Sequence, residues 1–214
     1  ARRPRSFPAS GAWWALAPAI RPAASAAPLT EAMQSRRVWT LGLVHAATFG
    51  LAVLTGIWIT TFLVHEFDLT LVHAGAAGSA ILALGVLSRP LGGLVVDRGW
   101  LGAAAVMRLT VLAGAIGLLV LAWPGRPLAV AALAIGTLGV ALNAPYAAVM
   151  QTTAGALPRA PGAAVGLVSG IGVVSIAAGA PAVGALLAAT GGFALPLALL
   201  AAYSLAVLWT LSTL

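Results

Sequence analysis

The sequence predicts an all-α membrane protein built from six transmembrane helices. Hydrophobic residues make up 61% of the 214 residues and charged residues only 7%, whereas a soluble domain carries about a quarter charged residues. Apolar stretches longer than about 18 residues recur along the chain, and each can cross a bilayer core of about 30 Å. A transmembrane barrel would alternate in polarity over segments of about ten residues. The runs of Ala, Leu, Gly and Val found here do not alternate.

Residues 1–37 are predicted to be a cytoplasmic linker or tail, largely disordered. The segment is rich in arginine and proline and has no sustained apolar periodicity. A signal peptide is the alternative, because basic residues precede the apolar run 13–20, but Pro18 and Pro22 interrupt that run. The chain begins at Ala1, so a fragment and a processed product both stay open, and Met33 offers an internal start.

Residues 38–214 are predicted to form the transmembrane bundle. Polar residues at 65–68 close the first span, and Asp-Arg-Gly at 97–99 closes the second. Pro-Gly-Arg-Pro at 124–127 is a strong turn signal after the third span, and the stretch from Pro158 to Pro161 separates the fourth span from the fifth. The predicted spans cover residues 38–64, 71–96, 103–123, 128–150, 162–189 and 192–214.

The arginines predict the orientation of the bundle. With six spans, the tail, the region 89–108 and the loop of Arg159 lie on one side and hold ten of the eleven arginines. The other side holds only Arg126, together with Glu66 and Asp68. Positive charge marks the cytoplasmic side of a cell or inner membrane, so both termini are expected to be cytoplasmic. Orientation also explains the net charge of +7, and no nucleic-acid partner is predicted.

The stretch Ser-Arg-Pro-Leu-Gly-Gly-Leu-Val-Val-Asp-Arg-Gly, residues 88–99, carries the clearest motif. It resembles the loop motif of the major facilitator superfamily, Gly-x-Leu-x-Asp-Arg-x-Gly-Arg-Arg, at Gly93, Asp97 and Arg98. Trp-Leu-Gly at 100–102 departs from the rest of that motif. The resemblance implies a gating segment, with which Arg89 is grouped, whose ion pairs form and break during transport. A charged loop that only obeys the orientation rule is the alternative.

Six spans, the arginine-rich leader and this motif together resemble the C-terminal six-helix half of such a transporter. The resemblance covers nearly all of residues 30–214. It implies secondary transport of a small solute by alternating access, with a missing N-terminal half or a second copy of the chain as partner in the lipid bilayer. The alternatives are a non-transporting six-helix subunit or scaffold and, more remotely, an intramembrane hydrolase using Ser169, Ser175 or His45.

The fifth span carries glycines at four-residue spacing and an internal proline. Gly166 and Gly170 belong to a small-residue stripe that would allow close helix packing, and Pro181 permits bending. The pattern resembles the fifth helix of a facilitator half, and generic small-residue packing is the alternative.

Polar residues inside spans are the candidates for a substrate cavity, because they are unfavourable in lipid. Asn143 and Tyr146 lie in the kinked half of the fourth span, and the resemblance implies that the first and fourth helices line the cavity. An inter-helix hydrogen bond is the alternative for Asn143, and a packing role is the alternative for the histidine of the first span. The first-span candidates are His45, Thr48, Thr55 and Trp58.

Several chemistries are not predicted. The chain has no cysteine, and His65, Glu66, Asp68 and His73 lack a repeated ligand spacing, so they are interpreted as solvated loop residues. Neither a metal ion nor a cofactor is expected, and an enzyme is not the favoured class. The Arg-Pro-Leu-Gly-Gly sequence also resembles nitrate or nitrite carriers, which implies an arginine deep in the second helix. Residues 79–85 contain none, so this resemblance does not predict the substrate.

Overall fold

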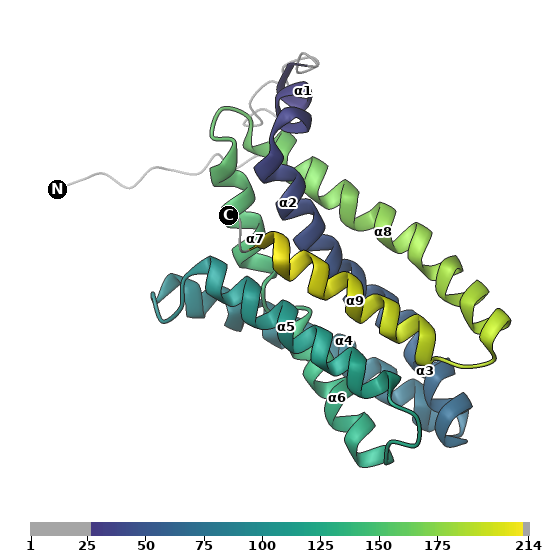
Figure 1. The fold of residues 1–214 in the computed structure, drawn as a ribbon. Helices are drawn as coiled ribbons and strands as arrows, with labels where there is room; N and C mark the ends of the chain where they lie inside the picture. Colours follow the sequence, from purple (N-terminus) through teal and green to yellow (C-terminus); the bar gives the residue numbers. More distant parts are fainter. Residues whose placement is uncertain (1–26, 212–214) are drawn as a thin grey trace, which may run out of the picture.

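The computed structural model describes residues 27–211, and its regular elements in that range are all helical (Figure 1). The predicted all-α fold with six helices long and apolar enough to cross a membrane is confirmed. The helices are α1 (Ala27–Gln34), α2 (Arg36–His45), the π-helix η2 (Ala46–Gly50), α3 (Leu51–Phe67), α4 (Leu71–Asp97), α5 (Ala103–Ala122), α6 (Leu128–Ala141), α7 (Tyr146–Ala156), α8 (Pro161–Thr190) and α9 (Ala194–Leu211).

Two of the six spans consist of more than one helical segment. The first span runs without a gap through α2, η2 and α3, and the fourth comprises α6 and α7 with turns between them. The fourth span reaches Ala156, six residues beyond its predicted end at Met150. Thr153 in these last turns is buried, and its hydroxyl donates to the Val149 carbonyl at 2.7 Å.

The last part of the predicted tail is helical, with α1 over Ala27–Gln34 and α2 beginning at Arg36. Residues 1–26 lie outside the described part of the chain. Ala32 of α1 is fully buried in a cluster with Val38 and Ala164, so α1 packs against α8. Ser35 caps α2 by accepting a hydrogen bond from the Val38 amide at 3.4 Å, and the Trp39 indole donates to the Met33 carbonyl at 2.8 Å. Burial and capping therefore order this segment.

The spans run back and forth between two ends of the bundle (Figure 1). The loops after α4 and α7 lie at the end that carries α1, and the loops after α3, α5 and α8 lie at the opposite end. A separate apolar cluster fills each end, one around Phe62 and Phe193 and one around Val38 and Met107. Phe49, Arg89 and Asn143 each lie at a position along their span between the residues of one cluster and those of the other.

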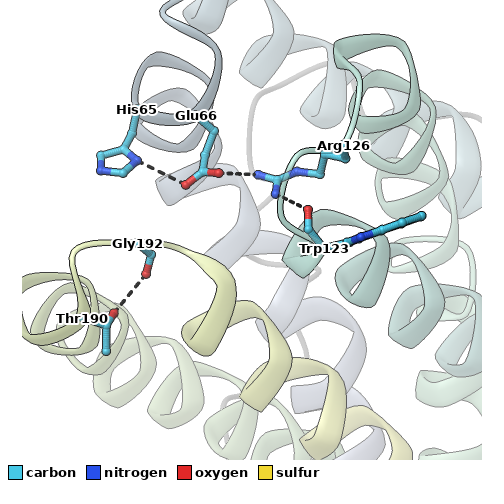
Figure 2. A network of polar contacts seen from close by, with 6 residues as sticks. All are labelled: His65, Glu66, Trp123, Arg126, Thr190 and Gly192. Carbon is cyan, nitrogen blue, oxygen red and sulfur yellow. Dashed lines mark hydrogen bonds and ion pairs between the residues drawn. The ribbon is translucent and has the colours of Figure 1, made fainter.

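A polar network at the end opposite α1 joins the first span to the α5–α6 loop (Figure 2). Arg126 Nη2 donates to Glu66 Oε2 at 2.9 Å, and Nη1 donates to the Trp123 carbonyl at 2.6 Å. The guanidinium lies over the Phe62 ring at 4.6 Å and the Phe67 ring at 5.5 Å, and only 3% of the Arg126 side chain is exposed. Glu66, a partly solvated residue in the last turn of α3, is therefore the ion-pair partner of a buried arginine.

Candidate functional site

Arg89 lies inside α4 and not in the loop that follows it. The residue is half-buried, and eight residues separate it from Asp97 at the end of the helix, which is about 12 Å at the rise of an α-helix. An arginine at such depth is unfavourable in lipid and marks a functional position by default. Residues 79–85 lack an arginine, but the same helix carries one four residues after Gly85.

The Arg89 guanidinium is held by an amide and two aromatic rings. Its Nε and Nη2 atoms donate to Asn143 Oδ1 at 3.2 and 3.0 Å. The guanidinium carbon lies 5.0 Å from the centre of the Tyr146 ring and 5.6 Å from that of Phe49. These partners come from the first and fourth spans, so Arg89 joins three spans at one point.

The fourth span bends at Asn143, in the turns between α6 and α7. Residues 142–145 form turns between α6 and α7, because Pro145 has no N–H to continue the helix. The Asn143 side chain is 5% exposed and its Nδ2 donates back to the Gly139 carbonyl at 2.9 Å. Gly85 of α4 leaves room for it, since a Cβ there would lie 3.0 Å from the amide. The predicted inter-helix hydrogen bond of Asn143 is thus formed, and its partner is Arg89.

Gly92 and Gly93 bring α4 against the fourth span. A Cβ at Gly92 would clash with the Ala144 backbone carbonyl, and one at Gly93 would lie 3.2 Å from the Ala147 side chain. The backbones approach closely here, which brings the Arg89 guanidinium within reach of Asn143 across the interface.

The π-helix η2 presents the aromatic wall of the site from the first span. The rings of His45 and Phe49 are stacked, with centroids 5.0 Å apart and planes 9° apart, and His45 also faces Tyr146 at 5.8 Å. His45 is buried against Gly172 of α8, where a Cβ would meet its ring. Its Nδ1 atom has no hydrogen-bond partner within residues 27–211. Single-turn π-helices inside α-helices are frequent at functional sites.

Arg89 carries a charge that the described residues do not balance. The ion pairs found between residues 27 and 211 involve Glu66 with His65 and Arg126, and Arg89 forms none. A cavity of about 230 Å³ lies beside Arg89 and Asn143. Its remaining lining is apolar, from Ala52, Val53, Ile81, Leu82, Gly85 and Val86. A fixed cation with planar donors beside a cavity is suited to binding an anion.

The other predicted cavity residues of the first span do not join this site. Thr48 and Thr55 are buried, and their hydroxyls donate to the Val44 and Leu51 carbonyls of their own helix at 2.8 and 2.7 Å. Trp58 packs against Gly184 and the Phe193 ring. The three side chains therefore contribute to packing between the first span and its neighbours.

The remaining motif residues, Asp97 and Arg98, lie at the C-terminal end of α4. Asp97 is the last residue of α4, and Arg98 caps the helix with its guanidinium 5.4 Å from the centre of the Trp100 ring. Neither residue forms an ion pair within the described part of the chain. The breakable ion pair that the motif implies therefore has no partner in residues 27–211.

The predicted packing glycines of the fifth span point away from the described helices. A Cβ at Gly166 or Gly170 would have no described atom within 4 Å, and both glycines are exposed, as is Pro181. Close packing of α8 uses Gly172 and Gly179 instead, which face His45 and Leu54. The four-residue spacing of these glycines was recognisable in the sequence, but the rotation of α8 about its axis, which decides the direction they face, was not. Ser175 donates to the Gly172 carbonyl at 2.6 Å.

Sequence reasoning missed Phe49 and the placement of Arg89. Phe49 lies exactly one helical turn after His45, but apolar residues are too common in a span to single one out. Arg89 had a usable signal, because it stands eight positions before Asp97 in a helical sequence. Grouping it with the loop motif hid its position at membrane depth.

Comparison with known proteins gives a partial likeness to a transporter. No family model matches the chain. Among curated proteins, a probable nitrate transporter NarT of Staphylococcus epidermidis is 32% identical over 72 residues, which is 34% of this chain and 19% of that protein. The match thus spans about a fifth of the length of the relative. Together with the six apolar helices, the likeness supports a multi-pass membrane transporter.

Proposed function

We propose that this chain forms one half of a secondary transporter that moves a small inorganic anion by alternating access, with Arg89 as the charged group of the binding site. The observation that carries the proposal is the half-buried Arg89 guanidinium, which bonds to a neutral amide beside a cavity and has no carboxylate partner in residues 27–211. A bound anion would supply the missing charge. The likeness to a nitrate transporter supports an oxyanion as the substrate class.

The physical reason is the balance of charge at membrane depth. Taking an arginine out of water is unfavourable unless an opposite charge or good hydrogen bonds compensate it. Asn143 and the faces of Phe49 and Tyr146 compensate part of this loss. An anion restores the rest and uses the planar donor geometry of the guanidinium. Binding is therefore expected to depend on the charge and the planarity of residue 89.

The proposal places a second six-helix unit opposite this one, either a further half or a second copy. The exposed face of α8, with Gly166, Gly170 and Pro181 beside the exposed Val173 and Val174, offers such a unit an apolar surface. In this arrangement both termini are cytoplasmic in a cell membrane, and Gly93, Asp97 and Arg98 form part of the gating segment. Asp97 and Arg98 then find their partners on the second unit.

The test is anion flux in liposomes that contain the intact gene product. Nitrate, nitrite, chloride and a neutral solute are offered with and without a proton gradient. We expect saturable nitrate or nitrite flux that Arg89→Gln reduces at least a hundredfold and that Arg89→Lys restores only in part. Arg159→Gln, which removes an exposed arginine from the loop between α7 and α8, serves as the matched control for lost charge. Correctly inserted protein without anion flux would favour a non-transporting subunit and contradict the proposal.

A further inference from the structure

We infer that Asn143 is an internal competitor of the transported anion, occupying the donor edge of Arg89 that the anion takes when it binds. The inference rests on the proposed function, because it assigns a role inside the same site. It concerns one edge of the Arg89 guanidinium, where one amide oxygen stands in the place that an anion oxygen would take.

The hydrogen bonds of Arg89 define which edge is occupied. A guanidinium has five N–H donors in a fixed plane, and a carboxylate or similar oxyanion binds two of them side by side. In residues 27–211 the Nε and Nη2 donors both go to the single atom Asn143 Oδ1, at 3.2 and 3.0 Å. Nε and Nη2 form one such edge. One neutral oxygen therefore satisfies two donors that a bidentate oxyanion satisfies with two charged oxygens.

The orientation of the Asn143 amide follows from its other bond. Its Nδ2 donates to the Gly139 carbonyl at 2.9 Å, and a carbonyl can only accept. The opposite amide atom facing Arg89 is therefore the oxygen, as a cationic donor also requires. Asn143 lies at the turns between α6 and α7, and both Asn143 and Arg89 line the 230 Å³ cavity.

The competition predicts whether each change at Asn143 raises or lowers the affinity for the anion. An anion must displace Oδ1 before it can use the Nε and Nη2 edge, so the bonds that Asn143 makes to Arg89 weaken anion binding by the amount they stabilise the empty site. An oxyanion still wins, because hydrogen bonds between two charged groups are stronger than those to a neutral amide. Removing the amide should strengthen anion binding. Replacing it with a carboxylate should weaken binding, because Arg89 then has a permanent counterion.

The experiment measures nitrate dissociation constants on the intact gene product in detergent, by calorimetric titration. Asn143→Leu keeps the branched shape of the side chain and removes the oxygen, and Asn143→Asp keeps the oxygen and adds charge. We expect a dissociation constant at least threefold lower for Asn143→Leu and at least tenfold higher for Asn143→Asp. Thr153→Val is the matched control, since that buried hydroxyl in the same span bonds only to its own helix. It should leave the constant within twofold of the unchanged protein.

Two results would overturn the inference. Weaker nitrate binding in Asn143→Leu would make Asn143 a ligand of the bound anion, and equal constants in both variants would remove it from the site. If Asn143→Leu does not fold, Asn143→Ala gives the same expected sign with a smaller side chain. Nitrate binding that is absent in the unchanged protein, with correct folding verified, contradicts the proposed function as well. Binding that is lost in Arg89→Gln but unaffected by Asn143 variants overturns only the competitor role.

Discussion

The pair of Glu66 and Arg126 allows a quantitative prediction about stability. Glu66→Gln removes the charge but keeps the shape of the side chain. Arg126 then stays buried, with 3% of its side chain exposed, one bond to a backbone carbonyl and a buried Nε that has no hydrogen-bond partner in the described residues. Breaking a buried ion pair from one side is destabilising by about 3–5 kcal/mol. Glu66 is 24% exposed, so water screens part of the interaction and we expect a loss of about 1.5–3 kcal/mol.

A substitution of Arg126, the partner of Glu66, separates the energy of the ion pair from the packing energy of the two side chains. Arg126→Met keeps a flexible apolar stem against the Phe62 and Phe67 rings and removes the charge. The double variant leaves no unpaired buried charge, so it should be less destabilised than the sum of the two single variants by at least about 1 kcal/mol. The control is His65→Ala, because that side chain contacts Glu66 from an exposed position and should change stability by less than about 0.5 kcal/mol.

The assay is reversible unfolding of the detergent-solubilised protein in a denaturing-detergent titration, followed by tryptophan fluorescence. Free energies of unfolding for the four members of the cycle give the coupling directly. Single-variant losses that add within about 0.5 kcal/mol would refute the reasoning, because the buried guanidinium would then be stabilised without Glu66.

Three further predictions follow from the packing and the loops. The Cβ of Gly92→Ala would meet a backbone carbonyl, so this variant should lower the free energy of unfolding in the same titration by about 1–3 kcal/mol. Gly75→Ala in the same helix places its Cβ in open space and should raise the free energy of unfolding by up to about 1 kcal/mol. Equal effects of the two variants would contradict the close approach of the helices at Gly92. In this cysteine-free chain, a membrane-impermeant maleimide added outside intact cells should label Gly192→Cys, and should label Gly102→Cys only after permeabilisation; the reverse pattern would contradict cytoplasmic termini. Tyr203→Phe removes a 3.1 Å hydrogen bond to the first span and should lower the free energy of unfolding by about 0.5–1.5 kcal/mol, and an unchanged value would show that this bond contributes nothing.

The sequence predicted some parts of the candidate site and not others, for reasons that can be stated residue by residue. Asn143 and Tyr146 were identifiable because polar groups next to a proline stand out in an apolar span. Thr48 and Thr55 gave the same kind of signal but bond to their own helix. A threonine hydroxyl can satisfy itself on the preceding turn, so its presence in a span says little about where the side chain faces. Gly166 and Gly170 illustrate the same ambiguity for helix rotation.

The sequence by itself determined the number of spans and their approximate bounds, because apolar length and turn residues are local properties of the chain. Only the tertiary structure decided which polar and charged side chains contact one another. Arg89 bonds to an amide 54 residues away and Glu66 pairs with an arginine 60 residues away. Neither separation along the chain follows a repeat or a motif that could be recognised in the sequence. The rotation of each helix about its axis sets these contacts, and that rotation follows from packing against all neighbouring helices at once.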